Sequence, residues 1–162
     1  MVVIVVLAVL LVIALPNFSA FVKDNRLSGY SADIQSAMSF ARSQAISRRR
    51  NITICPSSDS MSCNGTHWSD GLLVFVDGQT LGAADSGDDI LKSVQLADAF
   101  AKIDPLASDN FGGKSYLTYR PSGTVMNAGT LLICDDRVGN VGYQLRVWTT
   151  GRVELTSRQS CS

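Results

Sequence analysis

The sequence lacks most of what an enzyme or a metal site requires. It contains a single histidine, His67, and neither a phosphate-binding loop nor a Gly-x-Ser-x-Gly turn. Ser69 and Asp70 are close to His67 in sequence, but catalytic triads are not built from neighbouring residues. The four cysteines form no Cys-x-x-Cys pair, and one histidine does not complete a usual zinc set with them. We therefore predict a protein that is not an enzyme and that holds no metal and no cofactor.

The sequence also lacks net charge. Its fourteen basic and fourteen acidic residues cancel, so the chain as a whole has no electrostatic footprint for nucleic acid, and any such site must be local. We interpret the basic residues 48–50 as a helix end, where cations interact favourably with the helix dipole. A nucleic-acid or membrane-surface patch is the alternative there. Asp85, Asp88 and Asp89 do not have the spacing of a calcium-binding EF-hand and are interpreted as a solvated loop.

A long apolar run opens the sequence. Residues 1–15 are all apolar, slightly fewer than the roughly 20 needed to span a membrane as a helix. No basic residue precedes the run and no small-residue cleavage site follows it, so we expect a retained membrane segment rather than a signal peptide. Pro16 follows directly. Because proline removes a backbone donor and clashes with the preceding turn, we expect a helix kink at Pro16.

The helix is expected to continue to about residue 48 as an amphipathic helix. Its apolar residues recur mostly at three- and four-residue steps: Phe18, Phe21, Val22, Tyr30, Ile34, Met38, Ala41 and Ala45. The opposite side is polar: Lys23, Asp24, Arg26, Asp33, Gln35, Arg42 and Ser43. We therefore divide the chain into residues 1–22, the transmembrane or filament-core part of the helix, and residues 23–162, a periplasmic globular domain that includes the amphipathic part.

Short strands are expected after the helix. Turn residues separate apolar or alternating segments at 52–55, 72–76, 90–96, 115–119, 125–126, 130–134, 143–148 and 152–156. The polar stretches 56–70 and 77–89 are expected to be loops. The alternation of Tyr143, Leu145 and Val147 with polar residues indicates a half-buried strand of an antiparallel sheet. The predicted fold class is α+β, with one long helix packed on an antiparallel sheet or sandwich.

The cysteines indicate two disulfides. An even number of cysteines behind a membrane segment is typical of a protein in an oxidising compartment. Three pairings are compatible with the sequence. Cys55 with Cys63 and Cys134 with Cys161 are favoured, because these pairs join nearest partners and fasten a loop and the C-terminal segment. Four buried free thiols are the alternative.

The N-terminal pattern carries a family resemblance. Residues 1–18 and the amphipathic helix after them resemble the N-terminal helix of type IV pilins and type II secretion pseudopilins. The resemblance starts a few residues after the beginning of the family's mature N-terminal motif. Pro16 matches the helix proline of that family. The family's N-methylated Phe and assembly Glu are absent, so neither role is assigned to a residue here. Residues 54–63, 68–77, 119–124 and 150–153 resemble the GspH/FimT group of minor pilins and pseudopilins.

The resemblance implies a minor pilin of a type IV pilus. Such a protein passes once through the inner membrane, with its globular domain in the periplasm, and later lies in the filament at the cell surface. The resemblance implies that other major and minor pilins are partners and that the protein takes part in an initiation or tip complex. It also implies processing by a prepilin peptidase and assembly on a platform protein. The alternative is a GspH-type pseudopilin of type II secretion. The four cysteines and the loop at Cys55-Pro56 favour the pilus.

DNA binding is the competing function. Some FimT-type proteins bind DNA during natural transformation through a C-terminal Gly-Arg-x-Arg motif, to which residues 151–154 (GRVE) correspond. Glu154 replaces the second arginine, which removes one phosphate contact and adds a repulsive charge. Arg152, Arg158 and Arg146 are the candidate nucleic-acid-binding residues, with solvent-facing strand and tail positions as the alternative interpretation. DNA binding is therefore not favoured over a structural role.

Overall fold

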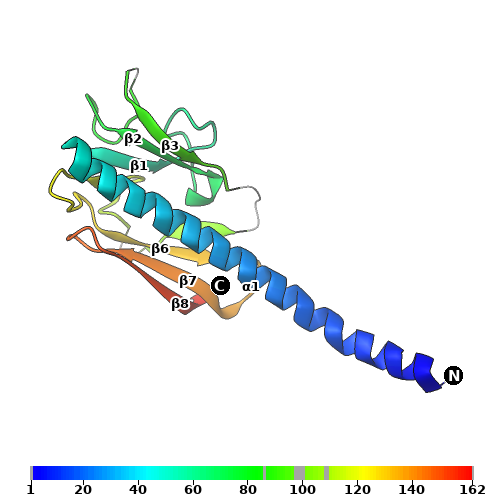
Figure 1. Ribbon diagram of the computed structural model, residues 1–162. Coiled ribbons are helices and arrows are strands. Elements are labelled where there is room, and N and C mark those ends of the chain that lie inside the picture. The colour runs from blue at the N-terminus through cyan, green and yellow to red at the C-terminus, as the bar shows by residue number, and fades with distance from the viewer. Residues whose placement is uncertain (1, 86, 97–100, 108–109, 162) are drawn as a thin grey trace.

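A single long helix opens the fold. The structure, a computed structural model, describes residues 2–85, 87–96, 101–107 and 110–161, with side chains of the first helix from Phe18 onward. Helix α1 spans Val2–Arg48 and continues through Pro16. The kink expected at Pro16 falls outside the described side chains and stays a prediction. In Figure 1 the first part of α1 extends away from the strands, whereas its second part lies across them.

The described strands form two antiparallel sheets, of order β3-β2-β1-β5 and β4-β6-β7-β8. Their bounds are β1 Ile52–Pro56, β2 Leu72–Val76, β3 Ile90–Val94, β4 Lys102–Pro105, β5 Leu117–Tyr119, β6 Gly129–Cys134, β7 Gly139–Val147 and β8 Val153–Cys161. A short 3-10 helix, η1 Trp68–Asp70, interrupts the loop between β1 and β2. Figure 1 shows the two sheets on either side of α1. The α+β fold predicted from the sequence is therefore confirmed.

One stripe of α1 builds the core together with both sheets. Its members recur at steps of three, four and seven residues, as one face of a helix requires, and all are fully buried: Leu27, Ile34, Ala37, Met38, Ala41 and Ala45. The strands contribute apolar residues from each sheet to the same cluster, among them Ile54, Val74, Leu131 and Leu145. Each large apolar side chain buried in this way contributes about 1.5–3 kcal/mol. The helix is thus held by side chains of both sheets at once.

The covered stripe begins later than the sequence pattern suggests. Phe18 and Phe21 belong to the predicted apolar face, yet they are 66% and 61% exposed. Among the helix side chains that the structure describes, Leu27 is the first fully buried one. Where side chains are described, no helical stretch is long and apolar enough to cross a membrane. Residues 1–15, on which the predicted span depends, lie outside that part.

Both disulfides have the pairing that the sequence favours. Cys55 is bonded to Cys63, with 5.5 Å between their Cα atoms, and Cys134 is bonded to Cys161, with 5.8 Å. The first bond closes the loop after β1, and the second joins the ends of β6 and β8. Gly142 leaves room for the second bond, because a Cβ atom there would lie 2.6 Å from the Cys161 sulfur. By loop length alone, the two bonds stabilise the fold by about 2.6 and about 3.6 kcal/mol.

Four of the predicted strands or loops differ in the structure. The strand expected at 125–126 is not formed, because Val125 makes only an isolated bridge with Tyr119. β4 was not expected, because Lys102, Asp104 and Pro105 give it little apolar character, but it pairs with β6 as an edge strand. β7 begins at Gly139, inside a segment expected to be a turn, and β8 continues to Cys161, five residues beyond the expected end. The polar end of β8 is held by backbone pairing with β7 and by the disulfide at Cys161. Such pairing leaves no apolar signal in the sequence.

Arg42 fastens two turns to the helix. Its Nε donates to the carbonyl of Gly123 and its Nη2 to the carbonyl of Thr150, both at 3.1 Å. The two turns touch each other as well, because Gly151 packs directly on the Gly123 carbonyl and has no room for a Cβ atom. Gly151 also needs its positive φ of 77°, which glycine adopts without strain. One arginine therefore joins α1 to a turn from each sheet.

The Arg42 contacts predict a measurable loss of stability. Replacing Arg42→Met keeps the apolar stem but leaves the part-buried Gly123 carbonyl and the exposed Thr150 carbonyl without their donor, so the free energy of unfolding should fall by about 1–2 kcal/mol. This corresponds to a melting temperature lower by roughly 3–6 °C. Thermal unfolding followed by circular dichroism measures the change. Arg50→Met, at an exposed position beyond the helix end, is the matched control, and an equal loss in both variants would contradict the role of Arg42.

Candidate interaction surfaces

The turn between β7 and β8 carries a compact polar cluster around Trp148. The Trp148 indole N–H donates to Glu154 Oε2 at 3.0 Å, and Arg152 Nη2 donates to the same oxygen at 3.0 Å. The Arg146 guanidinium lies 4.1 Å from the centre of the Trp148 ring, where cation–π attraction favours it. The Trp148 hydrogen bond, and after it the charge of Arg152, lowers the pKa of Glu154. Glu154 therefore stays ionised and neutralises part of this basic turn.

The three candidate arginines do not form one site. Arg146 and Arg152 share the Trp148 cluster, because Arg146 pairs across the sheet with Glu154. Arg158 lies at the other end of β8, with a left-handed φ of 61°. There it lines a cavity of about 300 Å³, which we call the helix-exit pocket, together with Asp24, Arg137, Asn140, Val141, Tyr143 and Ser157. The fold therefore does not bring the three arginines together into a single nucleic-acid site.

Other arginines join Arg146 and Arg152 at the end of the domain opposite the N-terminus. Pairing of Ile52 with Tyr119 sets Arg120 beside Asn51, directly after the basic run 48–50. Arg42 connects the turn after Arg120 to the turn before Arg152. We call residues 42–51, 120–124 and 146–154 the arginine end. They hold Arg42, Arg48, Arg49, Arg50, Arg120, Arg146 and Arg152, and Glu154 is their only acidic residue.

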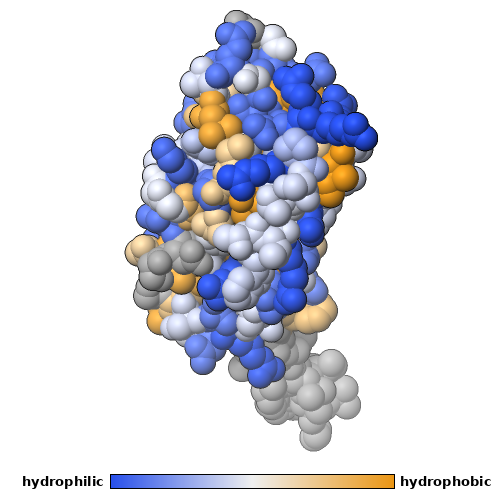
Figure 2. All heavy atoms as spheres, turned by 90° about the vertical axis from the view of Figure 1, so that its left-hand side faces the viewer, coloured by the Kyte–Doolittle hydropathy of each residue, from blue (hydrophilic) through white to orange (hydrophobic). Residues whose placement is uncertain are grey.

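Figure 2 looks onto this end of the molecule and shows a largely hydrophilic surface with isolated apolar side chains. Among the described residues, Arg48 pairs with Asp89 at 3.5 Å and Arg152 with Glu154 at 3.0 Å. The chain is neutral overall, but half of its fourteen basic residues lie on this end. The charge is therefore segregated, which a count over the whole sequence does not reveal.

His67 forms an ion pair that joins the η1 loop to strand β4. Its Nδ1 lies 2.7 Å from Asp104 Oδ1, so the loop that carries η1 is joined to the edge strand β4. The hydrogen bond with Asp104, and after it the charge of that carboxylate, raises the pKa of His67. Neither Ser69 nor another hydroxyl is bonded to His67 in the described part of the chain. The arrangement supports the fold and offers no nucleophile.

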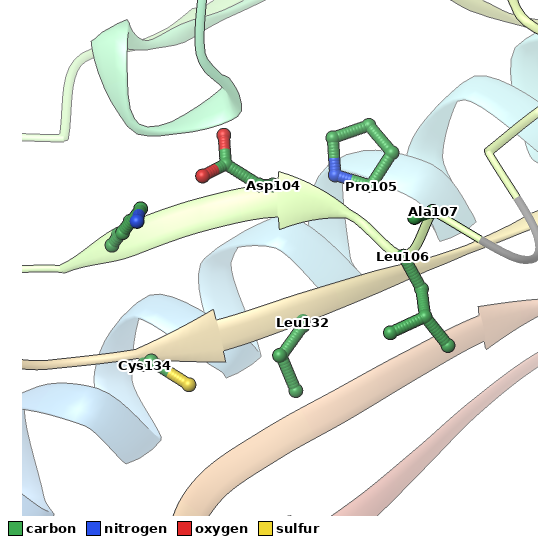
Figure 3. A pocket seen from close by; sticks show the side chains of 7 residues that line it. Asp104, Pro105, Leu106, Ala107, Leu132 and Cys134 are labelled. Atoms are coloured by element: carbon green, nitrogen blue, oxygen red, sulfur yellow. The ribbon is translucent and has the colours of Figure 1, made fainter. Parts of the chain in front are cut away.

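A small apolar hollow lies beside this ion pair. It has a volume of about 150 Å³ and is lined by Lys102, Asp104, Pro105, Leu106, Ala107, Leu132 and Cys134. Figure 3 shows Leu132 and Cys134 on one face of β6, with Leu106 next to them.

Within the described ranges, no group of three or more His, Cys, Asp or Glu side chains is placed to hold a metal ion. The sequence leaves free thiols as an alternative for the four cysteines, but all four are in disulfides.

The comparisons with known proteins decide the family. The profile of the family described as Type II transport protein GspH matches residues 31–151. The chain belongs to the GspH family. Its members are minor pilins and pseudopilins, structural proteins of type IV pili or of type II secretion that assemble with other pilins. The comparison with curated proteins gives no match.

Solved structures agree with the GspH-family fold. The type IV minor pilin FimU of Pseudomonas aeruginosa is similar with a TM-score of 0.65 and 23% identity, over 88% of this chain and 99% of FimU. The minor pseudopilin EpsH from the type II secretion system of Vibrio cholerae is similar with a TM-score of 0.55 and 13% identity, over 82% of this chain and 97% of EpsH. At these identities, the likeness establishes the fold alone.

The His67–Asp104 pair predicts a pH-dependent stability of this GspH-family domain. The pKa of His67 is raised above its ordinary value of 6.5 in the folded protein, so protonation favours folding. The contribution is fully present below about pH 6.5 and is lost as the pH rises through the higher pKa of the folded state. The melting temperature should fall over this range in the parent protein. His67→Asn should remove that slope, and an unchanged slope in this variant would refute the assignment.

Proposed function

We propose that this chain is a minor pilin of a type IV pilus, a subunit that contributes to pilus assembly as part of an initiation or tip complex. The supporting observation is the part of α1 that precedes the domain. From Phe18 onward, the first ion pairs between α1 and the rest of the domain are those of Lys23, whose Nζ lies 2.7 Å from Asp136, and of Asp24, which lies 2.8 Å from Arg137. The helix starts at Val2, so about 30 Å of it precedes these contacts.

The apolar sequence of that protruding part gives the physical reason for assembly. Residues 1–15 are apolar all round, and each would cost roughly 1 kcal/mol or more to expose to water. A segment of this kind is stable in a bilayer or against other apolar helices. The proposal therefore places the helix in the inner membrane before assembly and among the helices of other pilins afterwards, with residues 23–162 as the periplasmic domain.

A type IV pilus is preferred to a type II secretion pseudopilus. The two disulfides and the Cys55-Pro56 loop support the pilus, as in the argument from sequence. Extraction from the membrane and insertion into a filament then depend on partners outside the chain: a prepilin peptidase, an assembly platform and an ATPase. The chain itself has no phosphate-binding loop to supply such work.

Deletion in the host tests the assignment. We expect loss of the protein to reduce surface pili, and the full-length protein to appear in sheared filaments as well as in the inner-membrane fraction. A variant without residues 1–22 should accumulate as a folded soluble domain and should not restore pili, because the membrane and filament contacts are gone. Normal piliation with defective protein secretion would instead identify a pseudopilin.

DNA binding is a second candidate, supported by the clustering of basic side chains at the arginine end. Phosphate contacts by Lys and Arg supply most non-specific affinity for DNA, and that affinity depends steeply on salt. Opposing this, Glu154 lies within the cluster and is bonded to Arg152 and Trp148. We therefore expect the parent protein to bind DNA weakly, without sequence preference and with a shallow salt dependence.

Replacing Glu154→Gln tests this expectation. The change removes the negative charge that Arg152 neutralises, so DNA affinity should rise several-fold and the salt slope should steepen by about 0.9 per added phosphate contact. Fluorescence anisotropy with a labelled duplex at several salt concentrations measures both quantities. Asp33→Asn removes one charge from an exposed helix position outside the arginine end and is the matched control. Tight binding by the parent protein, abolished by Arg152→Ala, would move the protein into the DNA-uptake class.

A further inference from the structure

We propose that the helix-exit pocket binds the headgroup of a zwitterionic phospholipid of the phosphoethanolamine type and so seats the domain on the membrane before assembly. The inference rests on the proposed membrane-held state of the chain. It concerns Asp24, Asn140, Tyr143, Ser157 and Arg158, none of which the pilin function itself requires.

The location of the pocket is the first argument. The loop 135–138 between β6 and β7 is fastened to the helix by the pairs of Lys23 with Asp136 and of Asp24 with Arg137. These are the contacts at which α1 leaves the domain toward its apolar sequence. Figure 1 shows this end of β7 and the nearby C-terminus on the side from which the helix extends. The pocket therefore faces the direction in which a membrane would lie.

Exposed apolar side chains mark the same level of the molecule. Phe18 and Phe21 are 66% and 61% exposed on the helix, and Val138 is 81% exposed on the loop. Asp24 follows Phe21 by three residues, or about 4.5 Å along the helix axis. The headgroup layer on each side of a bilayer is about 5–8 Å thick. With Phe21 at the edge of the hydrocarbon, the pocket lies within the headgroup layer.

The chemistry of the lining selects the ligand. Arg158 has no ion pair among the described residues and offers a guanidinium, while Ser157 and Asn140 offer hydrogen-bond donors, a set that suits a phosphate group. Asp24 remains 62% exposed beside its contact with Arg137, so its carboxylate can accept from an ammonium group. Arg137 is shared between Asp24 and Asp135, so these three groups keep one net negative charge, which an anionic headgroup would not neutralise. A choline headgroup has no N–H to donate. Phosphoethanolamine complements both charges.

Quenching by brominated lipids tests the proposal in the full chain. Val138→Trp places an indole on the exposed loop tip, and the full-length variant is incorporated into nanodiscs of phosphatidylethanolamine, phosphatidylcholine or phosphatidylglycerol brominated near the carbonyl end of the acyl chains. We expect stronger quenching in phosphatidylethanolamine than in the other two lipids. Adding Arg158→Gln should lower the docked fraction about fivefold, since one basic group near a lipid surface contributes on that scale. Arg158→Lys should retain much of the quenching, and Arg50→Gln at the arginine end should change nothing.

Each outcome of this experiment is decisive. Equal quenching in all three lipids, or quenching that ignores Arg158→Gln, would overturn the headgroup site while leaving the membrane-held pilin intact. Stronger quenching in phosphatidylglycerol would replace it with an anionic-lipid site. Competition with soluble compounds separates the remaining case. If inorganic phosphate abolishes the stronger quenching in phosphatidylethanolamine and soluble phosphoethanolamine does not, the pocket is a phosphate site rather than a phosphoethanolamine site. Failure of the full chain to enter nanodiscs would refute the proposed membrane-held state together with the inference.

Discussion

The burial of one helix stripe against two sheets is the contact on which the rest of this fold depends. The two sheets share no strand, and the buried residues between Leu27 and Ala45 form one cluster with apolar side chains from both. Alanines at 37, 41 and 45 let the strands approach the helix closely, and Met38 and Ile34 fill the space between. Polar contacts then fix details: Arg42 at one end, and Lys23 and Asp24 at the other.

The two ends of the domain differ in their electrostatics. The residue ranges of the arginine end hold seven basic side chains and one glutamate, and Asp89 pairs with one of the seven, Arg48. At the helix exit, opposite charges are paired: Lys23 with Asp136, and Arg137 with both Asp24 and Asp135. The first arrangement creates a positive field, whereas the second nearly cancels its own and leaves short-range contacts to act. Partners of different chemistry therefore suit the two ends.

Much of the fold follows from patterns in the sequence, and the misses have identifiable causes. The helix from residue 2 to 48 is readable because apolar spacing and the final arginines agree about it. Most strands are readable from apolar runs such as residues 72–76. β4 and the end of β8 are not, because backbone pairing and a disulfide hold polar segments in place. Nor does sequence show that Arg158 lies apart from Arg152, or that Arg120 lies beside Asn51, since both depend on strand register.

The position of α1 also determines how the domain responds to pulling. A force applied to the protruding end of the helix acts along its axis, parallel to the surface that it shares with both sheets. Sliding α1 by one turn would displace every buried residue from Leu27 to Ala45 at once, and would break the Arg42 bonds to Gly123 and Thr150 in the same step. Contacts loaded together in shear resist more than contacts opened one after another. The fold is thus built to carry tension through its helix without unravelling.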